Sequence, residues 1–572
     1  MDLLRQEAMG GLNLEKNNSK RPLEQIWTRA NVGEVLPNVV TPLTWSVIRA
    51  TLTVDNSRKM DPEQFWLASE GSEAVEAAGE SAGLPAAHHT LSRQDGRVYL
   101  RMDALLDTFC YLPGVTPGVM GKVLGVGIPP EAAGYTPPRG LRVRLAQAVF
   151  RLEALGLLPR LATTAQFILR RLPQPPGSGP GQELALLRWT AKCFRLHLKA
   201  TAAAVGAYAW LERLLPAEER ELLPQILLGR EDLQTARQGR SLWRLAEVVL
   251  ADQELLEVFG EFRQGAPLDW SQVRQRLEGF PSGRQFLQDF QAFLNENGAR
   301  AAGEFELALP RWREDPGFVL EVLQKNLAAA QDGPSLAFST GRRQEAAAEA
   351  VAAIRAGKSP LQRLFFDRLL HAYGGFSTLR ENLKYSLMEG YALLREVILE
   401  KAERLVAAGL LATRQDIFFL TPAEILNLEE RVGRPEQIAA WIGRRKEQHA
   451  RWEALPAAQD GPAAAQPGAL AGIGSSPGVI AGVARVLMDP SQAGELQPGE
   501  ILVAPHTDPG WTPLFLSCAA VVTETGGFLS HGATVAREYG IPCVVSVHGA
   551  TSLIHTGDWI HVDGTHGRVA LQ

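Results

Sequence analysis

The sequence predicts a multidomain protein in which a large, mainly α-helical region is followed by a small α/β domain. The length of 572 residues exceeds what one ordinary hydrophobic core accommodates. Up to about residue 455, apolar residues recur at three- and four-residue spacing, as in segments 141–158, 184–214 and 361–411. Beyond residue 470, short strand-like segments replace this helical pattern.

Two interruptions divide the chain. A Pro- and Gly-rich run at 173–182 separates two helical blocks and marks a subdivision of the helical region. A second run, at 456–469, is small, Pro-rich and almost uncharged, as interdomain linkers are. The predicted domains are therefore residues 1–455, mainly helical, and residues 470–572, joined by a flexible linker.

The C-terminal segment has the pattern of a compact α/β module of about the smallest size that folds independently. One helix is expected near 532–539, ended by Gly540 and Pro542. Strands are expected on both sides of this helix, at 479–488, 500–504, 521–523, 543–547 and 559–562.

Composition argues against several kinds of partner. Lys+Arg 58 and Asp+Glu 63 give a formal net charge of -5, so no overall positive charge attracts nucleic acid or an anionic membrane. No apolar run reaches the length of a membrane span, and charged residues interrupt the N-terminus. We expect a soluble protein of the cytoplasm. The cysteines are widely separated and show no C-x-x-C spacing, which favours neither disulfides nor zinc: Cys110, Cys193, Cys518 and Cys543.

The run 523–542 carries the chemistry. A buried strand ends at a Gly526-Gly527 turn, Ser530 is placed to cap the following helix, and His531 falls in its first turn. A helix N-terminus offers unpaired N–H donors and a partial positive charge, and glycines let the backbone approach phosphate oxygens. A neutral imidazole there can attack a phosphoryl group. The pattern predicts an anion site that holds a nucleophile.

A single histidine more often only caps a helix or packs, but here the whole run resembles a known signature. It is similar to the phosphohistidine motif of the mobile domain of phosphoenolpyruvate-utilising enzymes, which include phosphoenolpyruvate synthase, pyruvate phosphate dikinase and rifampicin phosphotransferase. The resemblance continues upstream in register from Gly472 to Leu514. One departure is Gly532, where alanine is usual, and it should loosen the first helical turn slightly. The matching residues are Gly526, Gly527, Ser530, His531, Ala533, Ala536, Arg537, Gly540, Ile541 and Pro542.

The resemblance implies a swivelling phosphohistidine domain. In such a domain His531 accepts a phosphoryl group and carries it between two separate active sites. The residues that the resemblance implies for phosphate binding are Thr525, Gly526, Gly527, Ser530 and Arg537. No metal ligands are expected, because the other histidines of this segment lack a zinc spacing with Cys or carboxylate support: His506, His548, His555, His561 and His566.

Three segments of the helical region resemble the rifampicin-phosphotransferase branch. Segment 31–46, expected to be an ordered loop, is similar to the opening of its substrate-binding domain. Segment 293–316 is similar too, but has Ala299 where histidine is expected, so any substrate role of that histidine is missing or reassigned. In the third segment, Arg380 and Lys384 stand at i and i+4 on a helix and could together grip a phosphoryl group. The alternative is that neighbours such as Glu381 pair with them on a solvated face.

The relatives also contain domains that this sequence does not show. Full-length members begin with an ATP-grasp domain, and phosphoenolpyruvate synthase and the dikinase end in a (β/α)8 barrel that binds pyruvate and magnesium. No glycine-rich phosphate loop precedes residue 31, and no Walker motif occurs. We expect this chain to bind no cofactor itself. ATP and Mg²⁺ are expected on an ATP-grasp protein that acts in trans.

The expected function is that of a phosphotransferase component. It passes a phosphoryl group from His531 to a hydroxyl of a small organic acceptor bound by residues 1–455. One alternative is a subunit of a split enzyme that resembles phenylphosphate synthase or phosphoenolpyruvate synthase. Another is a non-catalytic phosphocarrier or regulatory protein. The acceptor is not identified by the sequence, because the residues of a pocket are scattered along helices.

Overall fold

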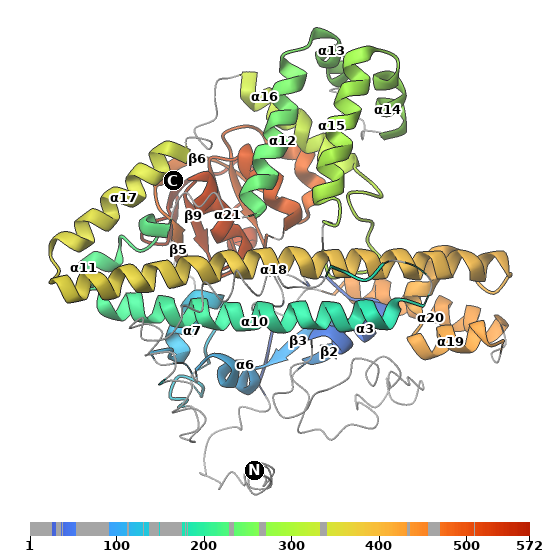
Figure 1. The fold of residues 1–572 in the computed structure, drawn as a ribbon, viewed down its shortest axis with the longest axis horizontal. Coiled ribbons are helices and arrows are strands. Elements are labelled where there is room, and N and C mark those ends of the chain that lie inside the picture. The colour runs from blue at the N-terminus through green and yellow to red at the C-terminus, as the bar shows by residue number, and fades with distance from the viewer. Residues whose placement is uncertain are drawn as a thin grey trace, which may run out of the picture.

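The computed structural model describes residues 26–29, 38–52, 91–136, 174–177, 181–227, 234–261, 270–331, 340–431, 435–455 and 470–572, apart from a few positions within these ranges, and isolated positions elsewhere. The described chain is mostly helical with a C-terminal α/β region, as predicted (Figure 1). The helix expected at 141–158 lies almost entirely outside the described residues, and the linker 456–469 lies wholly outside them. The domain boundaries and the subdivision near 173–182 stay predictions.

Two long helices, α10 (Glu183–Leu214) and α18 (Pro360–Ala407), lie side by side at the centre of the helical region (Figure 1). Both follow the predicted apolar periodicity. Helix α18 begins at a capping box, in which the Ser359 side chain accepts the Gln362 N–H and the Gln362 side chain accepts the Ser359 N–H. In the described part of the chain, no helix combines the length and the apolar character needed to cross a membrane.

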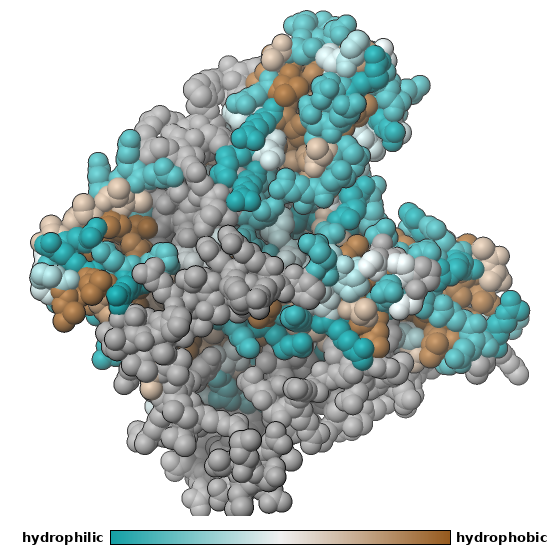
Figure 2. Space-filling view, viewed as in Figure 1, coloured by the Kyte–Doolittle hydropathy of each residue, from teal (hydrophilic) through white to brown (hydrophobic). Residues whose placement is uncertain are grey.

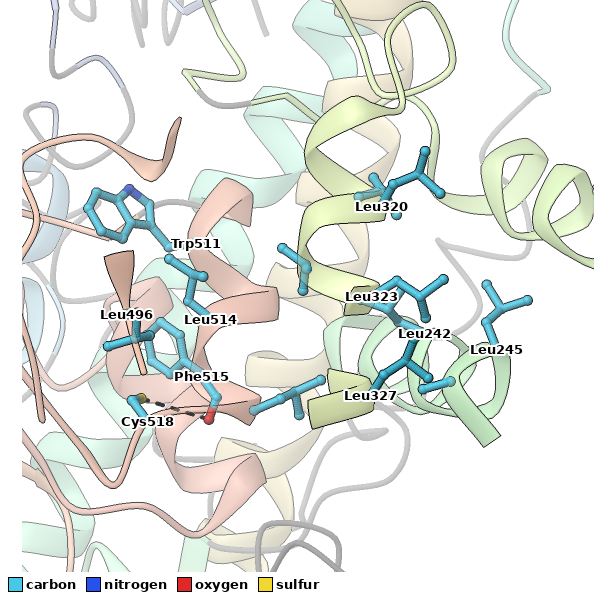
Figure 3. Packing of buried hydrophobic residues seen from close by; sticks show 14 of the residues in the cluster. Leu242, Leu245, Leu320, Leu323, Leu327, Leu496, Trp511, Leu514, Phe515 and Cys518 are labelled. Atoms are coloured by element: carbon cyan, nitrogen blue, oxygen red, sulfur yellow. Dashed lines mark hydrogen bonds between the residues drawn. The ribbon is translucent and has the colours of Figure 1, made fainter. Parts of the chain in front are cut away.

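A lobe of five helices stands beside the α/β domain (Figure 1). Its helices are α12 (Gln234–Leu250), α13 (Gln253–Glu261), α14 (Trp270–Glu278), α15 (Pro281–Asn297) and α16 (Gly317–Gln331). Leu242 of α12 and Leu323 of α16 belong to the same hydrophobic cluster as Trp511 and Phe515 of the α/β domain (Figure 3). The α/β domain therefore shares part of its core with this lobe.

The remaining helical elements flank the central pair. They are α11 (Ala217–Arg220), η4 (Gln225–Leu227), α17 (Thr340–Ala356), η6 (Arg414–Phe419), α19 (Pro422–Glu429) and α20 (Pro435–Glu453). Figure 2 shows hydrophilic residues over much of the described surface of the lobe, and an apolar patch where α17 meets the start of α18. Leu361 at this end of α18 is 75% exposed.

A small antiparallel sheet, in the order β1-β3-β2, was not predicted. Its strands are β1 (Trp27–Thr28), β2 (Leu91–Gln94) and β3 (Arg97–Arg101), and the helices near it are α3 (Pro42–Leu52), α6 (Met102–Phe109) and α7 (Pro117–Leu124). The prediction of a loop over 31–46 is wrong for residues 42–46, which begin α3. Pro42 is the first residue of α3, where the fixed φ of proline suits a helix and its missing N–H costs nothing.

The C-terminal domain is built on a sheet of eight described strands, in the order β4-β11-β10-β6-β7-β8-β9-β5. The strands are β4 (Leu470–Ala471), β5 (Ile473–Ser476), β6 (Val479–Val486), β7 (Ile501–Ala504), β8 (Ala520–Thr523), β9 (Cys543–Val545), β10 (Trp559–Asp563) and β11 (Arg568–Leu571). β6 to β9 are parallel, and the other pairs are antiparallel.

The strand predictions at 479–488, 500–504, 521–523, 543–547 and 559–562 coincide with β6 to β10. The predicted helix at 532–539 is α21 (His531–Tyr539). The short strands β4, β5 and β11 were missed. The domain also contains the 3₁₀ helices η7 (Pro490–Glu495) and η8 (Pro509–Leu516), and the short helix α22 (Ala550–Leu553).

The loop between β8 and α21 docks on the C-terminal end of α7. The Phe528 N–H donates to the Lys122 carbonyl at 3.0 Å, and the Leu529 N–H donates to the Val123 carbonyl at 2.9 Å. These carbonyls belong to the last turn of α7, where helix carbonyls lack an intrahelical partner. The Phe528 ring packs 4.9 Å from that of Tyr208 on α10. The loop thus ties the α/β domain to two helices of the helical region.

Glycine is required where this loop meets α7. A Cβ atom on Gly527 would lie 2.1 Å from the Gly125 nitrogen and 2.5 Å from the Val123 carbonyl oxygen. Both neighbours are backbone atoms of the helical region, which cannot move away as a side-chain end can. The close approach of the two domains therefore depends on the missing side chain of Gly527.

We predict that Gly527→Ala weakens docking of the α/β domain while leaving that domain folded. Forcing a methyl group into close backbone packing typically costs about 1–3 kcal/mol, and the three nearest atoms all belong to the helical region. Hydrogen exchange should become faster at the amides of Phe528 and Leu529. The matched control is Gly494→Ala, since a Cβ atom there meets nothing within 4 Å. Equal protection in both variants would contradict this role of Gly527.

Candidate functional site

The site is built at the N-terminus of α21. Gly526 has a φ of +123°, which favours glycine and turns the chain after β8. Ser530 is the N-cap of α21 in an extended conformation, and its Oγ accepts the Ala533 N–H at 3.3 Å. His531 is the first residue of the helix. The predicted arrangement of glycine turn, serine cap and histidine is thus present.

His531 is buried, with 4% of its surface exposed. Burial, and then the positive charges of Lys384, Arg300 and Arg380, hold the pKa of His531 well below its ordinary value of 6.5. The imidazole is therefore neutral at neutral pH, as a nucleophile toward phosphorus must be. The predicted pair Arg380 and Lys384 does lie near His531, and Arg300 joins it from a separate segment.

The three cations are held by carboxylates. Arg380 forms an ion pair with its neighbour Glu381. Arg300 donates to Glu304 Oε1 at 2.5 Å, and Lys384 Nζ lies 3.9 Å from Glu304 Oε2. The pairing of Arg380 with Glu381 had been the alternative interpretation, but the face is buried rather than solvated. Arg380 and Lys384 therefore pair with carboxylates and also act on His531 through their charges.

Tyr385 and Gln238 connect the cations to α12. The guanidinium of Arg300 lies 3.8 Å from the centre of the Tyr385 ring, a cation–π contact. The Tyr385 hydroxyl donates to Gln238 Oε1 at 2.5 Å. Arg300 lies in the matched segment 293–316, yet no local pattern marked it, because its proximity to α18 arises only from the fold. Sequence reasoning missed Arg300, whose charge acts on His531, and Glu304, which pairs with Arg300.

The residues implied for phosphate binding have other contacts in the described structure. The Thr525 hydroxyl donates to the Pro505 carbonyl at 3.1 Å, and the Gly526 carbonyl accepts the Ser546 hydroxyl at 2.5 Å. Arg537 donates to the Ser475 carbonyl at 2.8 Å. These contacts hold the loop and α21 against the sheet. A phosphate-binding role for Thr525, Gly526, Gly527, Ser530 and Arg537 stays a prediction.

The departure at Gly532 has a packing reason. A Cβ atom at Gly532 would lie 2.2 Å from Thr507 Oγ1 and 3.6 Å from the Phe515 ring. Alanine at this position would require Thr507 to move, so glycine suits the approach of Thr507 to the first turn of α21.

His197 on α10 also lies in this region. Its Nδ1 lies 3.0 Å from the Arg380 carbonyl oxygen, which makes Nδ1 the protonated nitrogen of a neutral ring. Burial and the charge of Arg380 lower the pKa of His197 to about 3. At the position where the resemblance led us to expect histidine, Ala299 is buried.

The described residues contain no cluster of three or more His, Cys, Asp or Glu side chains that could hold a metal ion. Among the C-terminal histidines, His566 pairs with Asp563 at 2.7 Å at the turn that follows β10. All four cysteines are free and buried.

Comparison with known proteins agrees with this geometry. Residues 496–567 match the family model of the PEP-utilising enzyme, mobile domain, and residues 196–381 match that of the rifampicin phosphotransferase fourth domain. The α/β domain is therefore of the class found in phosphoenolpyruvate-utilising enzymes. About two thirds of the chain is similar to part of the rifampicin phosphotransferases, which confirms the resemblance seen in the sequence.

Three curated relatives show how far the similarity extends. The rifampicin phosphotransferase of a Streptomyces sp is 32% identical, over 66% of this chain and 44% of that protein. The rifampicin phosphotransferase of Bacillus subtilis is 30% identical, over 59% and 40%. The prodigiosin synthesizing transferase PigC of Serratia marcescens is 36% identical, over 63% and 41%. The match thus spans less than half the length of these relatives.

We predict that docking of the α/β domain weakens as the pH falls below 6.5. The pKa of His531 is lowered in the docked state, in part by cations of the helical region, so an undocked domain binds a proton that the docked domain does not. Each pH unit below 6.5 then shifts the equilibrium toward undocking by up to about tenfold. Small-angle X-ray scattering at decreasing pH measures the change.

The matched variant is His531→Asn, which should show a weaker pH dependence. His506 contributes in the same direction, because burial and the charge of Arg29 lower its pKa to about 4. Some pH dependence of docking should therefore persist in His531→Asn and should decrease further when His506→Asn is added. An undiminished dependence in the double variant would contradict the assignment.

Proposed function

We propose that this chain is a phosphotransferase that passes a phosphoryl group from His531 to a hydroxyl of a small organic acceptor. The observation that carries the proposal is the buried His531 beside Lys384, Arg300 and Arg380. Three cations around a neutral imidazole form a site for negative charge, and a phosphoryl group on the imidazole supplies that charge. The family matches over both regions support the same activity.

The chemistry of transfer needs little more than position and charge. Phosphoryl transfer proceeds through a loose transition state whose negative charge is spread over three oxygens. Cations already fixed in a buried site stabilise that charge without having to reorganise. The ion pairs with Glu304 and Glu381 fix Arg300, Lys384 and Arg380 before the phosphoryl group arrives.

We propose that the phosphoryl donor is an ATP-grasp protein that binds ATP and Mg²⁺ and acts in trans. In the docked arrangement His531 is buried among residues of the helical region, so loading from a donor requires the α/β domain to leave. The interface with the donor must then be transient, since His531 has to return to the acceptor side.

The acceptor is proposed to be a hydroxyl compound bound by the helical region. The names of two relatives include rifampicin, and another acts in prodigiosin synthesis, so similar chains are associated with different small molecules. Rifampicin is therefore the first acceptor to try within a panel of hydroxyl compounds.

The direct test is labelling with [γ-³²P]ATP and Mg²⁺, with and without a candidate ATP-grasp protein. We expect an acid-labile label on His531 only when the partner is present, and loss of the label to rifampicin or another hydroxyl compound. The His531→Ala variant should remain unlabelled. Labelling of that variant to the wild-type extent would contradict the site. A stable label that no hydroxyl compound removes would instead indicate a phosphocarrier.

We predict that Arg380→Ala and Lys384→Ala each slow transfer from loaded His531 by about a hundredfold or more, the effect of losing one charge-stabilising donor. Loading occurs away from this site and should stay within about twofold of wild type. The control is Arg404→Ala on the same helix, since Arg404 is exposed and pairs only with Glu400 at 3.2 Å among the described ion pairs. Equal transfer rates in all three variants would assign Arg380 and Lys384 a structural role.

A further inference from the structure

Glu304 presents a carboxylate oxygen without a hydrogen-bond donor in the described structure. The side chain is buried, with 2% of the residue exposed. Its Oε1 accepts a 2.5 Å hydrogen bond from Arg300, but its Oε2 accepts none from the residues described. Lys384 Nζ lies 3.9 Å from Oε2, beyond hydrogen-bond distance.

Glu306, two residues further along the same segment, shows what a structural carboxylate looks like in this protein. Its Oε1 accepts from the Thr44 hydroxyl at 2.6 Å, the Thr41 hydroxyl at 2.8 Å and the Ala308 N–H at 2.8 Å. Its Oε2 accepts the Thr41 N–H at 3.0 Å. The fold thus saturates one buried carboxylate with donors and leaves an oxygen of the other open, although leaving a buried acceptor unpaired destabilises the folded state.

The Glu304 carboxylate shares its cationic partners with the reacting group. Its two cationic neighbours, Arg300 and Lys384, are the same side chains whose charges act on His531. A donor that reaches Glu304 Oε2 therefore comes close to cations that act on His531. The hydroxyl of the acceptor is such a donor, and in the transfer reaction it has a proton to lose.

We propose that Glu304 Oε2 binds the acceptor hydroxyl and takes its proton as the phosphoryl group leaves His531. The inference rests on the proposed function and deepens it, because it names the group that selects and activates the acceptor. The imidazole of His531 can itself take a proton, but only after its bond to phosphorus has broken. Glu304 is placed to act earlier, while the imidazole nitrogen is still bonded to phosphorus.

The step balances as follows. The hydroxyl oxygen of the acceptor forms a bond to phosphorus, and the bond from phosphorus to the His531 nitrogen breaks with its electron pair returning to the ring. The hydroxyl proton passes to Glu304 Oε2. The other ring nitrogen of His531 keeps its proton throughout, so the ring leaves as a neutral imidazole. The products are a phosphate monoester, neutral His531 and a protonated Glu304, which loses its proton to solvent when the α/β domain leaves.

The test compares Glu304→Gln with Glu306→Gln in protein loaded on His531 with ³²P. Glutamine at position 304 can still accept from Arg300 but cannot take a proton, so transfer to rifampicin or to phenol should fall by about a hundredfold, within the range for loss of general base catalysis. Glu306→Gln should lower the melting temperature, yet transfer as wild type below it. Loading of His531 should be unchanged in both variants.

Transfer rates to two acceptors distinguish a role of Glu304 in proton transfer from a purely structural role. With 4-nitrophenolate, which has already lost its proton, Glu304→Gln should transfer at nearly the wild-type rate. A purely structural role would slow phenol and 4-nitrophenolate by the same factor, and that result would overturn the inference. Should Glu304→Gln fail to fold, Glu304→Asp and Glu304→Asn replace it. The Asp variant keeps a carboxylate, so its transfer rates to phenol and to 4-nitrophenolate should differ little. The Asn variant should transfer to phenol much more slowly than to 4-nitrophenolate.

The experiment also distinguishes failure of the proposed phosphotransferase function from failure of the role of Glu304 alone. If loaded wild-type protein loses its label no faster with any hydroxyl compound than free phosphohistidine does, the phosphotransferase proposal is overturned, and Glu304 with it. If wild type transfers and Glu304→Gln transfers equally fast to phenol, only the role of Glu304 is overturned.

Discussion

His531 is buried as a neutral imidazole, and the positive side chains of Lys384, Arg300 and Arg380 act on it. A protonated His531 is unfavourable there, because burial and the charges of Lys384, Arg300 and Arg380 oppose it. A phosphoryl group reverses the sign of that interaction, since it brings negative charge to the same place. The side chains that keep the imidazole unprotonated are thus the ones that favour its phosphorylated form.

Buried cations need partners, and the way this chain supplies them shapes the site. Glu381 comes from the helix that carries Arg380, whereas Glu304 comes from a distant segment and lies near both Arg300 and Lys384. Without these carboxylates the cations would repel one another in a medium that screens charge poorly. The result is a cluster assembled before any phosphate is present.

Local signals predicted the part of the site that is local. The strand, glycine turn, Ser530 cap and His531 follow one another in sequence, and the spacing of Arg380 and Lys384 places both on one helix. Arg300 and Glu304 could not be found in that way, because packing between segments far apart in the chain brings them to Lys384 and the charge of Arg300 to His531. Gly527 was interpreted as a residue that lets the backbone approach phosphate. In the structure it faces Gly125 of the helical region, a long-range contact that no local rule describes.

Long-range contacts of this kind also set the free-energy cost of undocking the α/β domain, which the proposed function requires. Undocking breaks the hydrogen bonds of Phe528 and Leu529 to α7 and exposes the aromatic packing of Phe528 on Tyr208. It would also separate Trp511 and Phe515 from Leu242 and Leu323, unless the lobe of α12 to α16 moves with the domain. Exposure of that apolar surface is unfavourable in proportion to its area. Domain movement without a large barrier therefore needs either a lobe that travels with the α/β domain or a donor surface that covers the same side chains.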